Sequence, residues 1–364
     1  MIIKEVIAHL EELAPLGQAE DFDNVGLLVG EYHTPVTGIL VTLDTLENVV
    51  DEAISKQCNL IVSFHPIIFG GLKKITGANY VERVVLKAIR HNIAIYSMHT
   101  ALDNSKQGVN AKICEVLAIQ EPRILIPKKA FLKKLTTYIP QANAEQLRQA
   151  LYQAGAGHIG NYSNCSFSLD GTGSYKPNEH ANPHLGKIGE THYEQETQIN
   201  ITYTKEKESQ ILAALFKNHP YEEVAYEIQS LDNTHQHLGM GMYGNLEKPL
   251  KEEAFFDIIK EKMNVSCIRH TQLLGKEVQK IAVLGGSGSF AISAAKAVNA
   301  DVFITSDIKY HQFYEAENKI VLADIGHFET EQFTKNLLVD YLKKKIPNFA
   351  ISLSESLTNP IKYY

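Results

Sequence analysis

The chain has 364 residues, 44% of them hydrophobic and 21% charged, with a formal net charge of −7 at pH 7. This length exceeds what one hydrophobic core of ordinary size serves, so we expect two or three domains. The acidic balance argues against a general nucleic-acid binder, which needs a basic face. No apolar run approaches the roughly 20 residues that span a bilayer.

The cysteines and the N-terminal residues indicate in which cellular compartment the protein is expected. Four cysteines lie far apart in the sequence and form no CxxC pair. This pattern favours reduced thiols over a disulfide framework or a zinc ribbon. Residues 1–13 form an amphipathic pattern with acidic side chains, which is not typical of a signal peptide. We therefore expect a cytoplasmic protein.

The first third of the chain alternates short apolar strands with amphipathic helices. An N-terminal helix is followed by an acidic turn at residues 20–24 and a short strand that ends at Gly30. The pattern then predicts strands over 38–43, 60–63 and 93–98, and helices over 44–58, 80–91 and 109–117. This alternation is typical of βαβ units and predicts a largely parallel sheet covered on both faces.

The pattern changes at about residue 126. It then predicts a strand over residues 130–139, a helix over 143–154, a strand over 165–169 and a glycine-rich loop over 171–175. A strand over 195–203, a helix over 207–218 and a final strand over 219–228 follow. This order indicates a ferredoxin-like α+β unit. The parallel pattern resumes after about Gly244, with strands predicted over 279–284, 301–305 and 320–323. We therefore predict an α/β domain made of residues 1–126 and 241–364, interrupted by an insert over residues 127–240.

Polar side chains follow directly after four predicted strands. They are His65, His99 with Asp103, Ser306 with Asp307, and His327 with Glu331. Neighbouring parallel strands lie under about 5 Å apart, and ligands gather at their carboxyl ends. We expect these strand ends to converge on one crevice. Imidazole and carboxylate groups without a thiolate suit zinc, manganese, iron or cobalt.

His327 and Glu331 form the most informative pair of these side chains. The sequence predicts a strand over 320–323, a tight turn at Gly326 and a helix that begins at His327. Residues four apart on a helix point the same way, so both side chains can reach one metal ion. The alternative is a solvated first helical turn, in which Glu329 and Glu331 favour the positive end of the helix.

Other candidate groups have weaker patterns. Residues 285–289, Gly-Gly-Ser-Gly-Ser, lie between a strand and a helix. Their backbone N–H groups could hold a phosphate, or they could form only a tight turn. By position, Asp44, Asp307 and His311 are candidates for supporting metal ligands or carrying protons. Three histidines of the insert fall in a loop rich in Gly, Pro and Asn, where we expect them to be solvated: His180, His184 and His192.

Six segments together resemble one family, the Nif-three-like dinuclear-metal-centre proteins, which carry the name GTP cyclohydrolase I type 2. The segments are residues 23–30, 65–69, 99–103, 285–288, 305–311 and 326–331. The resemblance covers essentially the whole chain, and the insert is similar to the P-II-like module of longer bacterial members. It implies a homohexameric ring of α/β subunits with two divalent metals in each subunit.

The resemblance also implies a set of metal ligands. His65 and Asp103 would hold the first ion, Glu331 would bridge both ions, and His327 would bind the second. The family usually has two successive histidines before the proline, and this chain has Phe64 at the first of them. Phenylalanine has no lone pair to donate, so we expect one or two ions per subunit. His99 is either a further ligand or, as we favour, a supporting group outside the ligand set.

The implied chemistry is hydrolysis. Two bridged divalent ions supply hydroxide at neutral pH and attract a nucleotide or another phosphorylated small molecule. The family name implies opening of the purine imidazole ring of GTP with release of formate, and His99 or His311 would then transfer protons. The alternative is a metal-binding regulatory or scaffolding protein without turnover, which the P-II-like insert and Phe64 favour. We expect no membrane or nucleic-acid partner.

Overall fold

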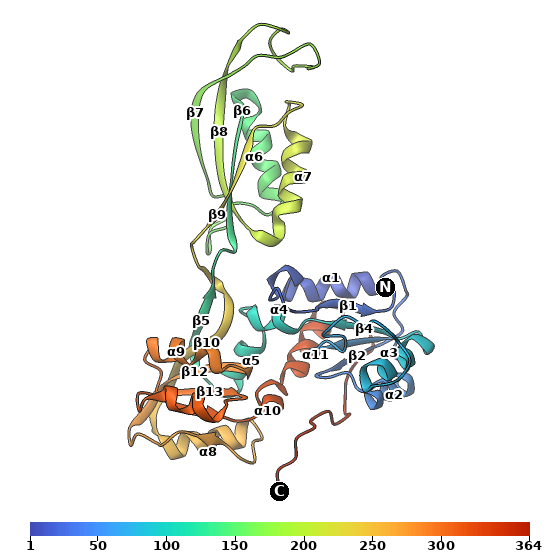
Figure 1. The fold of residues 1–364 in the computed structure, drawn as a ribbon, viewed down its shortest axis with the longest axis vertical. Helices are drawn as coiled ribbons and strands as arrows, with labels where there is room; N and C mark the ends of the chain where they lie inside the picture. Colours follow the sequence, from blue (N-terminus) through green and yellow to red (C-terminus); the bar gives the residue numbers. More distant parts are fainter. The chain divides into compact units, whose positions relative to one another are not determined.

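The computed structural model describes residues 1–364. The chain forms two compact units, one made of residues 1–127 and 237–364, the other of residues 128–236. Figure 1 shows both units as a ribbon, with labels on many of their helices and strands. None of the helices combines the length and the apolar character that crossing a membrane requires.

The first sheet of the larger unit has the strand order β1-β4-β3-β2-β15. Its strands are β1 (Gly26–Val29), β2 (Ile39–Thr42), β3 (Leu60–Ser63), β4 (Ala94–Ser97) and β15 (Ile351–Leu353). Strand β1 is antiparallel to β4, and the other neighbours are parallel. The three middle strands β2, β3 and β4 are buried at every residue. Such continuous burial requires helices on both faces of the sheet.

Helices cover the two faces of this first sheet in separate sets. On one face, Leu40, Ile61 and Ile95 pack in a cluster with apolar residues of α2 (Glu47–Ser55) and α3 (Tyr80–Arg90). On the other face, Val41, Val62 and Tyr96 belong to the largest core cluster, with residues of α1 (Ile3–Leu13), α4 (His99–Asn104), α5 (Val109–Val116) and α11 (Thr334–Lys345). Both faces of these strands are buried, so their sequences show little alternation between apolar and polar residues.

The second sheet of the larger unit has the order β11-β14-β13-β12-β10-β5. Its strands are β5 (Gln120–Lys128), β10 (His235–Lys251), β11 (Arg269–His270), β12 (Glu277–Ser287), β13 (Val302–Ser306) and β14 (Val321–Asp324). Strands β12, β13 and β14 are parallel to one another, while β10 runs antiparallel to β12 and β11 runs antiparallel to β14. Alternate residues of β12–β14 join the largest core cluster, together with α8 (Glu252–Lys262). The others pack with α9 (Ile292–Ala297) and η5 (Tyr310–Ala316).

The mixed α/β class expected from the sequence is confirmed, and so is the largely parallel, doubly covered sheet expected for the first third of the chain, but the expectation that the later strands continue the same layer is wrong. The strands predicted over 38–98 and over 279–323 all form, and they belong to two separate sheets. Buried strands of either sheet have the same apolar pattern, so sequence periodicity cannot assign a strand to a sheet. Two long strands that complete the second sheet, β5 and most of β10, were not predicted from the sequence.

The smaller unit is one four-stranded sheet with two helices. The elements are β6 (Leu132–Pro140), α6 (Ala144–Gln153), β7 (Ser166–Tyr175), β8 (His192–Thr204), α7 (Glu208–Asn218) and β9 (Tyr226–Leu231). The strand order is β7-β8-β6-β9, and each paired neighbour is antiparallel. This connectivity is the β-α-β-β-α-β order of a ferredoxin-like unit. Both helices pack on one sheet face through apolar residues such as Leu147 and Leu215.

One element of the smaller unit corrects a prediction. Residues 171–175, expected as a glycine-rich loop, are the end of β7. They pair with β8, with Gly171 opposite Glu196 and Gly173 opposite Glu194. The long strand β8 provides the backbone partners for these residues, a pairing that glycine does not itself favour. Gly173 also leaves space for a neighbour, because a Cβ there would overlap the Glu196 carboxylate.

Candidate metal centre

His65 follows directly after β3 and is held by a carboxylate on its outer side. Its Nδ1 lies 2.8 Å from Oδ1 of Asp44. The other oxygen of Asp44 accepts a hydrogen bond of 2.8 Å from the hydroxyl of Thr358. A carboxylate on one ring nitrogen fixes the ring orientation and leaves the other nitrogen as the donor atom for a ligand. For His65 that donor atom is Nε2.

His327 repeats this arrangement from the second sheet. Gly326, at φ 98°, ends the turn after β14, and α10 (His327–Glu331) begins at the next residue. Nδ1 of His327 lies 2.7 Å from Oδ2 of Asp307, which follows the neighbouring strand β13 with a φ of 56°. Nε2 of His327 is 3.2 Å from Oε2 of Glu331, one helical turn away. The helical spacing therefore places both side chains on one face, as predicted.

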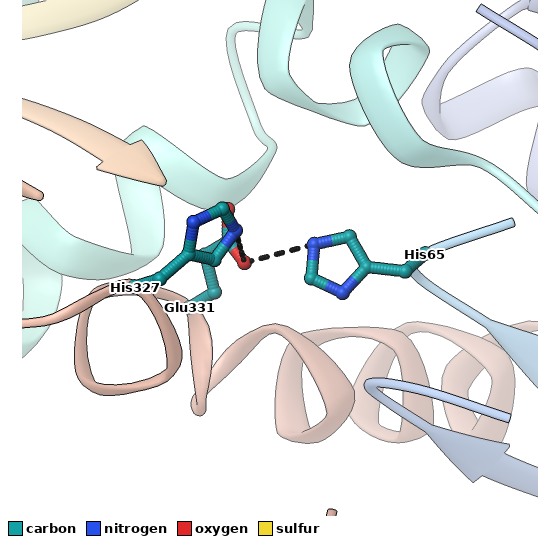
Figure 2. A group of neighbouring side chains, drawn as sticks. All are labelled: His65, His327 and Glu331. Atoms are coloured by element: carbon teal, nitrogen blue, oxygen red, sulfur yellow. Dashed lines mark ion pairs between the residues drawn. The ribbon is translucent and has the colours of Figure 1, made fainter. Parts of the chain in front are cut away.

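The two sheets bring these groups together at one point (Figure 2). Nε2 of His65 lies 3.1 Å from Oε2 of Glu331. One ligand atom from each of His65, His327 and Glu331 lies within 4.8 Å of the others. His65 comes from the first sheet of the larger unit, and the other two residues follow β14 of the second. The convergence predicted for strand ends therefore occurs between two sheets, not along one.

The Glu331 carboxylate fits a metal ligand. Its side chain is only 3% exposed, and its Oε2 is buried without a hydrogen-bond partner. Both imidazole nitrogens lie at ion-pair distance from this oxygen, but neither makes an aligned hydrogen bond to it. A buried charge in this state is costly unless it is compensated. A cation between the three atoms would compensate it, and two imidazoles with one carboxylate suit zinc and similar ions.

The pKa shifts of the three residues in the cluster also fit a bound cation. Burial disfavours the charged imidazole of His65, yet Asp44 and Glu331 outweigh this effect and raise its pKa to about 10. For His327, burial is likewise outweighed, mainly by Glu331, and the pKa rises to about 9. Burial would raise the pKa of Glu331, but the two histidines lower it to about 2. Two protonated imidazoles and one carboxylate carry one excess positive charge. A divalent ion that replaces both protons leaves this charge unchanged.

Asp103, expected to share the first ion with His65, lies outside this three-residue cluster. It is on α4, and its Oδ1 is buried without a hydrogen-bond partner. Burial, and then the charge of Glu331, raises the pKa of its carboxyl well above the ordinary value, while the two cluster histidines oppose this. Asp103 is thus electrostatically linked to the cluster, and its role as a ligand stays a prediction.

The two histidines expected to move protons have different surroundings. His99, at the start of α4, has a φ of 25°, and its Nδ1 lies 2.8 Å from Oδ1 of the buried Asp23. Its ring centre is 5.3 Å from that of His65. His311 is exposed on η5, where its ring packs against Tyr310 at 5.2 Å. Only His99 is in contact with the cluster, and neither catalytic role is tested by this geometry.

Phe64 and the glycine loop define the walls of the cluster. Phe64 is fully buried, with ring centres 4.9 Å from His65 and 5.6 Å from His99. The N–H groups of Gly285 and Gly286 donate to the side chains of two neighbouring residues, Asn110 and Thr330. These groups are therefore used inside the protein, which argues against a phosphate cradle. Residues 285–287 are the end of strand β12, so the tight turn expected there is also wrong for these residues. A Cβ at Gly286 would overlap Glu331, so this glycine makes space for the ligand.

Sequence reasoning assigned no role to Asp23 or Thr358. Asp23 accepts hydrogen bonds from the backbone N–H of Thr100 at 3.0 Å and contacts His99. Hydrogen bonds from His99 and Thr100 outweigh its burial and lower its pKa. Asp23 lies in the acidic turn before β1, next to a strand as His65 is, and it begins the first of the six segments that carry the family resemblance; these were its signals. Thr358 lies beyond the last strand and gave none.

Comparison with known proteins places the chain in a family. The family described as Duf34/NIF3 (NGG1p interacting factor 3) matches residues 1–360. A protein of Bacillus subtilis (strain 168) named GTP cyclohydrolase 1 type 2 homolog is 39% identical over 368 residues, covering 99% of this chain and 98% of the relative. A relative of the same name from Halalkalibacterium halodurans is 36% identical, covering 98% of each chain.

A solved structure agrees with this assignment. The crystal structure of a Bacillus cereus protein related to NIF3 is similar with a TM-score of 0.84 and 35% identity, and the match covers 100% of this chain and 99% of that one. The similarity therefore includes both compact units. From the match over nearly all of its length and these relatives, the chain belongs to the Duf34/NIF3 family.

Proposed function

We propose that the protein is a divalent-metal-dependent hydrolase of the GTP cyclohydrolase type, which opens the imidazole ring of a purine nucleotide and releases formate. The single observation that carries the proposal is the convergence of His65, His327 and the unpartnered carboxylate of Glu331. The name of the relatives supports the reaction type. When bound, a divalent ion supplies a water molecule of lowered pKa, the nucleophile that such a ring opening needs.

The chain's own residues would prepare the site for this chemistry. Asp44 and Asp307 contact Nδ1 of His65 and His327, which would keep a proton on that nitrogen and leave Nε2 of each ring free to hold an ion. His99 is held by Asp23 beside His65, and under this proposal it would pass a proton to or from the reacting atoms. Fully buried Phe64 excludes water from one side of the cluster.

A cavity of about 370 Å³ adjoins His65 on the side of Asp44, with neither His327 nor Glu331 in its lining, and part of the substrate would occupy it. It is lined by nine residues, among them Asp44, Tyr80 and Thr358, and no lysine or arginine is in the lining. A phosphorylated substrate therefore depends on the bound cation for its countercharge. This favours a reaction that requires metal for substrate binding as well as for activation of water.

The test has two parts, metal content and turnover. Elemental analysis of untagged protein, purified without chelators, should find one or two equivalents of zinc, manganese, iron or cobalt per chain. GTP should then give formate, and Glu331→Gln should give none. Absence of formate from fully loaded wild-type protein would contradict the hydrolase proposal. A metal content near zero would contradict the metal centre itself.

Phe64 favours a second candidate, a metal-binding regulatory or scaffolding protein without turnover. This fully buried side chain offers no lone pair beside the three converging ligand atoms, so the chain provides a better site for one ion than for two. Under this alternative the protein holds one ion per chain, and Phe64→His raises the content to two. Formate release that appears only in Phe64→His would favour the alternative for the natural chain.

The resemblance also implies a homohexamer and a P-II-like insert, and we propose both for this protein. In solution the hexamer would have six times the chain mass of 40.6 kDa. Sedimentation equilibrium measures this directly, and a monomer or dimer at micromolar concentration would contradict it. The ferredoxin-like strand order of the smaller unit agrees with a P-II-like module.

A further inference from the structure

The smaller unit contains a cavity that the metal centre and its chemistry do not use. Its volume is about 380 Å³, within the range of small-molecule sites. It is lined by β6, β7, β8, the loop after β7 and the segment before β9. Ile139 and Ile199 pack in the core with the helices. Because side chains alternate along a strand, Tyr138 and Glu196 point to the opposite, helix-free face, where the cavity lies.

Aromatic rings form the walls of this cavity. Tyr138, Tyr175 and Tyr221 line it, and the rings of Tyr175 and Tyr221 meet edge to face with centres 5.7 Å apart. His184 adds a fourth ring, 6.3 Å from Tyr221. Aromatic faces attract cations, most strongly where water is excluded.

The loop after β7 is fixed in place over the cavity by hydrogen bonds. The hydroxyl of Tyr175 donates to the carbonyl of Leu185 at 3.0 Å. The backbone N–H of Asn182 donates to Glu222 at 2.7 Å, which ties the loop to the segment before β9. The cavity is thus built by contacts within the smaller unit and does not depend on a partner for its shape.

The lining has excess negative charge. Three carboxylates, of Glu196, Glu222 and Glu223, face one ammonium group, of Lys176. Glu196 is only 9% exposed, and one of its oxygens accepts a hydrogen bond of 2.8 Å from Tyr221. No residue donates to its other oxygen. A carboxylate this buried, with one oxygen unpaired in a cavity, is matched by a cationic donor.

We infer that this cavity is a binding site for a small organic cation that carries a primary ammonium or guanidinium group. Glu196 accepts its N–H donors, and the tyrosine rings pack on its charged or apolar part. An anionic ligand would meet three carboxylates and a single lysine. A metal ion is disfavoured as well, because the histidines and carboxylates here do not converge as they do at His65, His327 and Glu331.

Titration calorimetry on the full-length protein at low salt, with agmatine as the probe, tests this inference. Agmatine carries one guanidinium and one ammonium group. We expect saturable binding with one site per chain, and the affinity should fall with added sodium chloride because the attraction is electrostatic. Glu196→Gln keeps the size of the side chain and the acceptor for Tyr221 but removes the charge, and it should weaken binding at least about 10-fold.

The matched control for this variant is Glu194→Gln. Glu194 is two residues away on β8, pairs with His192 at 3.0 Å and does not line the cavity. It should leave the agmatine affinity within about 2-fold. Tyr138→Ala should weaken binding about 5-fold, whereas Tyr138→Phe, which keeps the ring, should not. Together these variants separate charge and ring contact from damage to the fold.

Three results would overturn the inference. The first is no saturable agmatine binding up to about 10 mM. The second is equal affinity in wild type and Glu196→Gln. The third is a blocked Gly-Arg-Gly peptide that binds at least about 10-fold more tightly than agmatine, because the site would then recognise an arginine side chain of a protein. Inorganic phosphate, used as the anionic probe, should not compete with agmatine for this cavity.

Discussion

Glu331 in the larger unit and Glu196 in the smaller are both buried carboxylates. Oε2 of Glu331 is a buried atom without a hydrogen-bond partner, whereas Glu196 accepts a hydrogen bond from Tyr221 on one oxygen and leaves the other to the cavity. Their neighbours differ. Glu331 lies between two imidazoles whose Nε2 atoms are 3.1 and 3.2 Å away, whereas Glu196 has a phenol donor and aromatic walls. Imidazole nitrogens have lone pairs that bind a metal ion, and phenol rings have faces that attract an organic cation. A buried carboxylate requires a countercharge, and the neighbouring side chains determine whether a metal ion or an organic cation provides it.

Glu52 adds a third case to this comparison, a carboxylate saturated by the chain itself. It accepts hydrogen bonds from Lys56, from the hydroxyl of Ser354 and from the backbone N–H groups of residues 355 and 356. These donors leave no oxygen for a ligand. Glu52 therefore fastens the segment after β15 to α2 and has a structural role.

The largest expected effect is a loss of metal affinity, and it should distinguish Glu331 from Glu196. Glu331→Gln keeps the side-chain shape but removes the charge between the histidines, and it should lower metal affinity at least about 100-fold. Elemental analysis after dialysis against metal-free buffer measures this. The control, Glu194→Gln on the smaller unit, should keep the full wild-type metal content. Metal retained in Glu331→Gln would contradict the role of this carboxylate.

A smaller loss is expected when the support of a histidine is removed. Asp44→Asn leaves all three converging atoms in place but weakens the hold on Nδ1 of His65. Outer partners of this kind are worth about 10- to 100-fold in metal affinity. A competition titration with a chromophoric chelator measures the change. If Asp44→Asn and wild type bind metal equally, ring orientation does not depend on this carboxylate.

Glu52 should show a pH dependence without any ligand. Burial alone would raise its pKa, but Lys56 and the donors of residues 354–356 lower it to about 2. Its contribution to the free energy of unfolding is therefore full above the ordinary pKa of about 4.5 and is lost as the pH falls toward about 2. We expect Glu52→Gln to cost about 1–2 kcal/mol at neutral pH.

Denaturant unfolding of wild type and Glu52→Gln across this pH range measures the effect. The two curves should converge as the pH approaches about 2. A constant difference at every pH would mean that shape, not charge, connects Glu52 to its partners. Metal and agmatine should not alter the difference, which distinguishes this carboxylate from Glu331 and Glu196.

The smallest effect concerns the orientation of Glu196. Tyr221→Phe keeps the aromatic wall and removes only the hydroxyl that donates to the carboxylate. The lost hydrogen bond should reduce agmatine affinity about 3-fold by calorimetry. A loss as large as that of Glu196→Gln would show that the hydroxyl itself contacts the ligand.

Local patterns predicted much of the fold because they depend on residues near one another in the chain. The buried strands after residues 38, 60, 93, 301 and 320 all formed, and so did the helices between them. The predictions failed where pairing with a strand distant in the sequence determines the local structure. Gly171 and Gly173 lie in a strand because β8 pairs with them. Strand β12 runs three residues past its predicted end, through Gly285 to Ser287, beside β13.

The same distinction applies to the candidate site. The sequence by itself placed His327 and Glu331 on one face, because the helical repeat is local, and placed His65 at the end of a buried strand. Only the tertiary structure decided that these strand ends meet across two sheets, that Asp44 and Asp307 hold the two rings, and that Gly286 leaves space for Glu331. Contacts between sheets depend on how separate layers pack, and no periodicity within a strand or helix encodes that packing.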